Sequence, residues 1–253
     1  MASRGPGGSP PRGQHFLKSR GFAAELVQTA GISDGDFVLE IGAGRGKITE
    51  ELSQRARAVL AIESDARLAR LLIERFEGRP EVMVVWADAL RFPPINERYR
   101  AFGNIPFGIT SSLLRRLLLG PEMALERADL IVQHGAAMKR LCRRGNLLNS
   151  LWGPWWLLKI ERVIPRHAFE PMPSVSAALL SIRKREVPML KEEDRHPYEI
   201  LVTTAFRDGR EPKRALAELF PGRRHLMHSD TRAIDLDTSQ WVELYQTLDS
   251  HDP

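Results

Sequence analysis

The chain has 253 residues, enough for one large domain or for an α/β domain with a small additional lobe. Apolar residues make up 43% of it, and no apolar stretch approaches the roughly 18 residues that a membrane-spanning helix needs, so we expect a cytoplasmic protein without a membrane anchor. The net charge of +5 and the sequence pI near 9.6 favour a polyanionic partner, with nucleic acid as the first candidate.

The chain begins with a segment, residues 1–12, that is rich in Gly, Pro and Ser and has no apolar core. This composition predicts a disordered leader and excludes a secretory signal. From residue 37 to about residue 185, short apolar runs alternate with helical patterns, which predicts a mostly parallel, seven-stranded sheet with helices on both faces. The expected strands are 37–41, 58–62, 81–86, 99–102, 130–132, 157–163 and 177–182, and the expected helices start near residue 48, cover 66–76 and 113–119, and follow residue 132.

The last part of the chain differs from the rest. Helical patterns with basic faces at 194–220 and 231–248 predict a small helical lobe. We therefore expect an α/β domain at 13–185 and a helical lobe at 186–253. Basic residues cluster at Lys139, Arg140, Arg143 and Arg144, at Arg183, Lys184 and Arg185, and at Arg207, Arg210, Lys213, Arg214, Arg223 and Arg224.

Three side-chain types invite functional readings that we set aside. Trp152, Trp155 and Trp156 are expected to pack in the core rather than to stack on bases. The lone cysteine, Cys142, excludes an internal disulfide and a cysteine-built zinc site. The histidines show no metal-ligand spacing, so no metal site is predicted.

A glycine-rich turn, Glu40-Ile-Gly-Ala-Gly-Arg-Gly46, lies between an expected strand and an expected helix. A dinucleotide-binding turn would need glycine at the position of Lys47, and a phosphate-binding P-loop would need Ser or Thr where Ile48 stands. The remaining pattern, an acidic residue followed by G-x-G-x-G, resembles the S-adenosyl-L-methionine loop of class I methyltransferases. Gly42 and Gly44 would then allow the cofactor to approach the backbone closely.

Two acidic residues stand where such a cofactor needs acceptors. Glu63 follows the second expected strand, where a carboxylate can bind both ribose hydroxyls, and Asp88 follows the third, where it can accept a hydrogen bond from the adenine amino group. Each taken alone is more often a strand-end or helix-capping residue, and Asp65 is expected to cap the helix at 66–76. The glycine-rich turn, Glu63 and Asp88 stand at the ends of three successive expected strands, and this combination favours a cofactor site.

The tetrapeptide Asn104-Ile-Pro-Phe107 follows the fourth expected strand, at the sheet edge where such folds bind ligands. The side-chain oxygen of Asn104 and the backbone carbonyl of Ile105 can accept the two hydrogens of an adenine amino group and favour a pyramidal nitrogen. Pro106 stiffens the turn, and Phe107 can stack on a base that has left its helix. The alternative is an Asn-initiated turn with its Phe in the core.

Together these motifs make the chain resemble the Erm family of ribosomal RNA adenine methyltransferases from Gly13 to about Lys184, with weaker similarity beyond. Gln14-His-Phe-Leu17 is similar to a family segment in which His15 and Leu17 would contact the cofactor. Phe169-Glu-Pro-Met-Pro-Ser-Val175 matches F-x-P-x-P-x-V, whose aromatic residue, Phe169, would help to hold the flipped adenine. The resemblance also assigns cofactor contacts to Gly42, Glu63, Asp88 and Asn104. Gln133 and His134 depart from the family's usual acidic-aromatic pair.

The resemblance implies methylation of N6 of an unpaired or bulged adenine in the peptidyl-transferase region of 23S rRNA, in protein-free or assembling large subunits. That mark would block macrolide, lincosamide and streptogramin B binding. We expect a monomer whose helical lobe contacts RNA in a basic cleft. Asn-Ile-Pro-Phe is typical of the Erm branch, whereas the small-subunit enzymes usually have Asn-Leu-Pro-Tyr. A 16S rRNA dimethyltransferase, a non-catalytic nucleic-acid-binding relative and a DNA adenine methylase stay open as alternatives.

Overall fold

The computed structural model describes residues 15–119, 124–142, 146–207, 212 and 232–249. The strands of its main sheet are β2 (Phe37–Ile41), β3 (Ala58–Glu63), β4 (Val82–Trp86), β5 (Tyr99–Asn104), β6 (Leu125–Gln133), β7 (Trp156–Ile164) and β9 (Ala177–Lys184). The helices are α1 (Arg20–Ala30), α2 (Lys47–Ser53), α3 (Ala66–Arg75), α4 (Thr110–Leu119), α5 (His134–Leu141), α6 (Leu147–Trp152), α7 (Arg195–Phe206) and α9 (Thr238–Asp249). Shorter elements are β1 (Phe16–Leu17), β8 (Phe169–Glu170) and the 3-10 turns η1 (Phe107–Ile109), η2 (Arg166–Ala168) and η5 (Ala233–Asp235).

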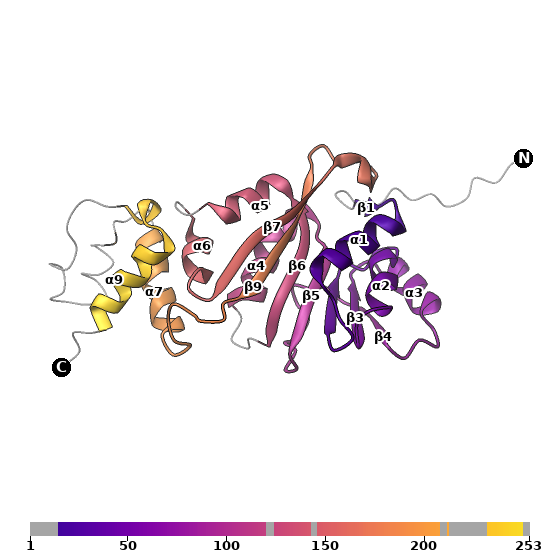
Figure 1. Cartoon of the computed structure of the whole chain (residues 1–253), viewed down its shortest axis with the longest axis horizontal. Helices are drawn as coiled ribbons and strands as arrows, with labels where there is room; N and C mark the ends of the chain where they lie inside the picture. The colour runs from indigo at the N-terminus through magenta and orange to yellow at the C-terminus, as the bar shows by residue number, and fades with distance from the viewer. Residues whose placement is uncertain (1–14, 120–123, 143–145, 208–211, 213–231, 250–253) are drawn as a thin grey trace, which may run out of the picture.

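The main sheet has seven strands in the order β4-β3-β2-β5-β6-β9-β7, with helices on both faces (Figure 1). Neighbouring strands are parallel from β4 to β6, whereas β9 is antiparallel to both β6 and β7. The predicted fold class, a mostly parallel seven-stranded α/β sheet, is confirmed. The connection from β7 to β9 carries β8, which pairs with β1 in a separate two-stranded sheet.

The central strands are mostly apolar because each one contributes to two hydrophobic cores. On β2, Val38 packs into the core that α1, α2 and α3 cover, and its neighbour Leu39 packs into the core that α4, α6 and α7 cover. Successive side chains of a strand point to opposite faces, so both are buried. Glu40 shares its face of β2 with Val38, and this polar exception lies directly beneath the glycine-rich turn.

Several elements are longer than the sequence predicts, and three of the differences bear on the site or on the sheet around it. β6 begins at Leu125 rather than at residue 130, and α4 begins at Thr110 rather than at residue 113. β5 continues to Asn104, which pairs with Ile131 on β6, so Asn104 ends the strand instead of following it. The apolar runs marked only the centres of these strands, because hydrogen bonding to a neighbour extends a strand through polar residues as well.

In the predicted helical lobe, the structure describes α7 and α9, which pack against α6 at one end of the molecule (Figure 1). The Tyr198 hydroxyl donates to the Ser150 carbonyl over 2.9 Å, and the rings of Trp155 and Tyr198 meet edge to face at 5.6 Å. The three tryptophans at 152, 155 and 156 are at most 1% exposed, which confirms their expected place in the core. The lobe therefore shares one core with the sheet.

Some predictions concern residues outside the described ranges. These are the leader at 1–12, most of the helical pattern between 208 and 220, and the basic residues Arg143, Arg144, Arg210, Lys213, Arg214, Arg223 and Arg224. Within the described ranges, no helix combines the length and the apolarity needed to cross a bilayer.

Candidate functional site

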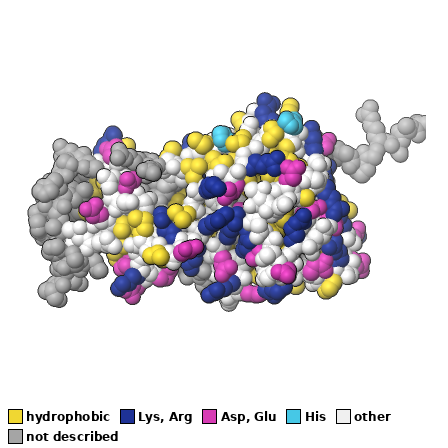
Figure 2. Space-filling model, viewed as in Figure 1, with side chains coloured by type: hydrophobic (Ala, Val, Ile, Leu, Met, Phe, Trp, Pro, Cys, Tyr) yellow, Lys and Arg dark blue, Asp and Glu magenta, His cyan; other side chains and the backbone are white. Residues whose placement is uncertain are grey.

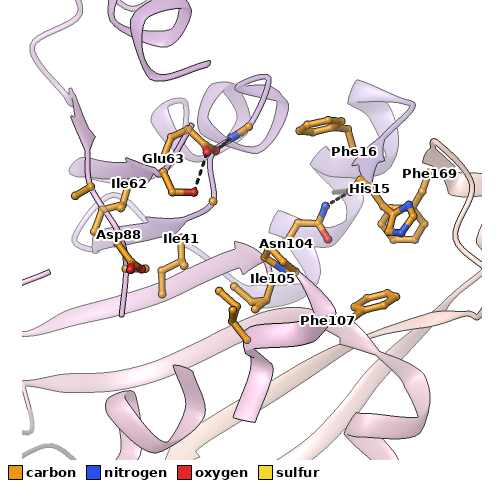
Figure 3. Close-up of a pocket in the computed structure, with 17 residues that line it drawn as sticks. His15, Phe16, Ile41, Ile62, Glu63, Asp88, Asn104, Ile105, Phe107 and Phe169 are labelled. Atoms are coloured by element: carbon orange, nitrogen blue, oxygen red, sulfur yellow. Dashed lines mark hydrogen bonds between the residues drawn. The ribbon is translucent and has the colours of Figure 1, made fainter. Parts of the chain in front are cut away.

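A pocket lies at the carboxyl ends of β2, β3, β4 and β5, where open α/β sheets usually bind their ligands. Every residue that the sequence placed in the site lines it, except Leu17: His15, Gly42, Gly44, Glu63, Asp88, Asn104, Ile105, Pro106, Phe107 and Phe169. Figure 3 shows Glu63 and Asp88 at one end of the pocket and the aromatic side chains of Phe107 and Phe169 at the other, with Asn104 between them.

The glycine-rich turn crosses from β2 over the end of β3, and its backbone amide at Gly42 donates to the Ile62 carbonyl over 2.9 Å. Gly42, Gly44 and Gly46 have φ values of 74°, 58° and 75°, a region that other residues rarely adopt. A Cβ atom on Gly44 would lie 2.8 Å from Cε1 of Phe16. Glycine is therefore required at position 44 by both the backbone conformation and the space available.

Glu63 is 3% exposed and is held by backbone amides. Its Oε2 accepts from the Gly44 N–H and its Oε1 from the Asp65 N–H, each over 2.8 Å. Oε1 also accepts a long hydrogen bond of 3.5 Å from the Ser64 hydroxyl, so Oε2 is the oxygen that retains a lone pair for a donor in the pocket. Asp65 caps α3 through the amides of Arg67 and Leu68, as the sequence predicted.

Asp88 follows β4 and combines the two roles between which the sequence left a choice. Its Oδ1 accepts from the Leu90 N–H over 2.9 Å, so it caps the turn that follows. Its carboxylate is half exposed and also lines the pocket. It is therefore available to an exocyclic amine without losing its capping bond.

Glu40, the acidic residue of the glycine motif, lies beneath the pocket and does not line it. It is 1% exposed, and burial raises the pKa of its carboxyl to about 8, with the nearby charge of Glu63 adding to the rise. Hydrogen bonding from Thr49, on α2, opposes part of that pKa rise. The turn thus rests on an acid that is largely protonated at neutral pH.

Asn104 is oriented by the N-terminal segment of the described chain. Its side-chain Nδ2 donates to the His15 carbonyl over 2.6 Å, as the dashed line in Figure 3 marks. Because the amide nitrogen is engaged there, Oδ1 is the atom that can accept from an incoming amine. Gly103 precedes it on β5, and a Cβ atom there would lie 2.4 Å from the Ile41 carbonyl oxygen, so glycine permits close approach to β2.

Aromatic rings form the other end of the pocket. Pro106 starts η1 and brings Phe107 to the wall, where its ring lies 5.9 Å from the ring of His15. Nδ1 of His15 is 2.8 Å from the Pro171 carbonyl oxygen, which links it to the loop that carries Phe169. Phe169 is only 1% exposed, so a ligand reaches it through the pocket alone.

Leu17 is the predicted site residue that the structure does not bring to this pocket. It lies opposite Phe169 in the antiparallel pair of β1 and β8, is 4% exposed, and lines a smaller neighbouring hollow. Phe16 lines the main pocket instead, because adjacent strand residues point to opposite sides. Sequence reasoning missed Phe16, because the pairing of β1 with β8 brings it to the pocket.

The surface seen in Figure 2 carries Lys and Arg side chains interleaved with Asp and Glu, without a single basic stripe on that face. Two arginines of the predicted basic clusters have structural partners. Arg140 donates to Oδ1 of Asn146, and Arg185 donates to the Gly153 carbonyl. Burial lowers the pKa of both guanidinium groups. These two clusters are thus only in part available to a polyanion.

The chain is similar to known proteins over most of its length. The family model described as ribosomal RNA adenine dimethylase matches residues 10–250. An rRNA adenine N-6-methyltransferase of Saccharopolyspora erythraea is 33% identical over 247 residues, which are 94% of this chain but 64% of that relative, so the chain spans less than two thirds of its length. The mycinamicin-resistance protein MyrB of Micromonospora griseorubida is 31% identical, with 95% of this chain and 79% of MyrB covered. The crystal structure of the 23S rRNA methyltransferase ErmE superposes with a TM-score of 0.76 at 31% identity, covering 92% of this chain and 99% of that one.

Proposed function

Because the chain belongs to the ribosomal RNA adenine dimethylase family, with the Erm proteins among its relatives, we propose that it methylates N6 of an adenine in 23S rRNA. The observation that carries the proposal is the order of groups along one pocket. Carboxylates at one end suit a nucleoside cofactor, aromatic rings at the other suit a base, and the Asn104 amide lies between them.

The residues at the acidic end fit S-adenosyl-L-methionine. Gly42 and Gly44 have positive φ values and line the pocket, so the turn can present its backbone to a ligand. Glu63 would bind the ribose hydroxyls, and Asp88 would accept from the adenine amino group. His15 and the backbone around Leu17 would close the site from the N-terminal side. The bound cofactor supplies an electrophilic methyl group on a sulfonium.

The residues at the other end would prepare the target amine. Asn104 Oδ1 and the Ile105 carbonyl accept its two hydrogens, which favours a pyramidal nitrogen and directs its lone pair. Phe107 stacks on the flipped base and offsets part of the unstacking cost, and Phe169 would contact it from the pocket wall. Pro106 keeps the turn in place. No strong base is needed, because the amine proton becomes acidic only as the nitrogen gains positive charge.

The large-subunit target rests on the Asn104-Ile-Pro-Phe107 form of the motif and on similarity to ErmE and MyrB, which are described as a 23S rRNA methyltransferase and a mycinamicin-resistance protein. Methylation at the peptidyl-transferase region would confer resistance to macrolides, lincosamides and streptogramin B. The protein would act as a cytoplasmic monomer on protein-free or assembling subunits.

The test is transfer of radiolabelled methyl from S-adenosyl-L-methionine to protein-free 23S and 16S rRNA, with digestion to identify the labelled base. We expect N6-methylated adenine in 23S rRNA, and a loss of about 100-fold or more in Asn104→Ala, since one oriented hydrogen-bonding group is removed. Asn96→Ala, on an exposed loop, is the matched control and keeps full activity.

Label confined to 16S rRNA would replace the proposed target with the small subunit. RNA binding without transfer to either RNA, by a protein that binds the cofactor weakly or not at all, would favour a non-catalytic relative and overturn the proposal. Efficient competition by DNA would favour a DNA methylase.

A further inference from the structure

We propose that Lys47 is a positioning residue that acts on Asn104 through the N-terminal strap, which we define as residues 15–18. The inference rests on the proposed function for its effect on catalysis, but the contacts that carry it are independent of that function. In the sequence, Lys47 stands where a dinucleotide-binding turn would need glycine. In the structure it joins the glycine-rich turn to the strap.

Lys47 is the first residue of α2, and its side chain is directed away from the helix to the strap. Its Nζ lies 2.8 Å from the Leu17 carbonyl oxygen and 2.6 Å from the Lys18 carbonyl oxygen. Both are charge-assisted hydrogen bonds, which are shorter and stronger than neutral ones. A lysine at the start of a helix opposes the helix dipole, so its position is not explained by stabilisation of α2 itself.

The strap is held on its other side by the loop that carries β8. The Lys18 N–H donates to the Ala168 carbonyl over 2.8 Å, and β1 pairs with β8 along two residues. The Arg45 guanidinium lies 4.9 Å from the centre of the Phe16 ring, which in turn covers Gly44. Two strand residues give few hydrogen bonds, so Lys47 supplies a large share of the polar contacts that fix the strap against the turn.

The strap reaches Asn104 through the backbone of His15. The His15 carbonyl accepts from Asn104 Nδ2 over 2.6 Å, two residues before the carbonyl of Leu17 that Lys47 binds. If the strap shifts, Nδ2 loses this acceptor and the amide is free to rotate. A rotated amide would present its NH₂ to the amine of the target base, and two donors cannot pair. Lys47 therefore keeps the acceptor atom of Asn104 toward the reaction.

The test compares Lys47→Met and Lys47→Arg in the full chain, with Lys18→Met as the control for loss of a nearby positive charge on an exposed side chain. Hydrogen exchange of the strap amides, including that of Lys18, is the readout that needs no activity. We expect at least about 10-fold faster strap exchange in Lys47→Met, with the amides of β2 and β5 unchanged. Lys47→Arg should restore most of the protection, and Lys18→Met should resemble the wild type.

Methyl transfer provides the second readout. We expect kcat to fall about 10-fold in Lys47→Met, with a smaller change in the KM for the cofactor and recovery in Lys47→Arg. Because the effect passes through Asn104, Lys47→Met should reduce kcat much less in an Asn104→Ala background, where there is no amide left to orient.

Unchanged strap exchange in Lys47→Met would overturn the proposal, as would equal losses of kcat with and without Asn104. If strap exchange is faster in Lys47→Met but the wild type methylates no RNA, the proposed function is contradicted. The contact between Lys47 and the strap would still be supported. If Lys47→Met does not fold, Lys47→Gln, which keeps one donor group, takes its place and is compared with Lys47→Arg. Equal strap exchange in Lys47→Gln and in the wild type would then overturn the proposal.

Discussion

The two ends of strand β5 carry polar residues that are used in opposite ways. At its amino end, the Arg100 guanidinium donates to the Ala30 and Gly31 carbonyls at the end of α1 and binds Asp36 and Asp129 over 2.9 and 3.3 Å. Asp129 also receives Arg127 over 2.7 Å. Each carboxylate in this cluster faces a cation, and the cluster ties α1 to the sheet.

At the carboxyl end of the sheet, the buried acids of the neighbouring strands β2 and β3 have no such partners. Glu40 and Glu63 form no ion pair among the described residues, and Glu63 is held by backbone amides instead. Asn104, which ends the same strand, has its amide nitrogen engaged and its oxygen directed to a ligand. The amino end uses its charges to stabilise the fold, whereas the carboxyl end leaves acceptors available at a cost in stability. Three predictions follow this contrast.

The largest expected effect is at the amino end. Asp129→Ala would remove the buried carboxylate that pairs with both Arg100 and Arg127, leaving Arg100 with Asp36 alone, and we expect a loss of about 3 kcal/mol in the free energy of unfolding. Urea denaturation measures it, with Asp34→Ala, an exposed aspartate, as the control. Methyl transfer per folded molecule should change little at low temperature. A small loss of stability with a large loss of activity would contradict the division between the two ends.

Glu40 should make stability depend on pH at the carboxyl end. Its pKa is about 8 in the folded protein against an ordinary 4.5, so the folded state binds the proton more tightly and is favoured fully only below about pH 4.5. That contribution, on the order of a few kcal/mol, is lost as pH rises to about 8. Glu40→Gln should remove this loss, so its stability relative to the wild type should increase from pH 5.5 to pH 8.5 in urea titrations. A constant difference between the two proteins would show that Glu40 is already ionised in the folded protein over this range and that its pKa is not raised.

Gly44→Ala tests the turn itself and has the smallest expected effect on stability, about 1–2 kcal/mol. Gly78→Ala is the matched control, because Gly78 also has a positive φ of 77° but has no atom within 4 Å of an added Cβ. The difference between the two variants isolates the collision with Phe16. We expect calorimetry to show a roughly 10-fold loss of cofactor affinity for Gly44→Ala alone. Equal affinities in both variants would show that the contact of Phe16 with the turn does not shape the cofactor site.

Much of the fold could be predicted from the sequence because its signals are local. The apolar runs located all seven strands of the main sheet, although β6 and β5 extend beyond them through residues that pair with neighbours. The Asp65 cap and the core position of the tryptophans were also predicted and are confirmed. These features depend on a few consecutive residues, so a single window of sequence contains them.

The candidate site was predicted in part. Gly42, Glu63, Asp88 and Asn104 each lie at or just beyond the end of a parallel strand, and strand order alone brings such residues to one edge of a sheet. Phe16 lines the pocket in place of the predicted Leu17, because the pairing of β1 with β8 decides which of them points to the pocket. That pairing joins segments about 150 residues apart, and no local pattern encodes its register.

The sequence by itself determined where the strands lie, which turn must be glycine and which tetrapeptide stands at the sheet edge, because backbone conformation and side-chain chemistry are properties of the residues concerned. Only the tertiary structure decided that Lys47 holds the strap, that the His15 carbonyl orients Asn104 and that Glu40 is buried without a cation. These depend on distances between segments that are remote in the chain, and such distances are set by the packing of the whole sheet and its helices.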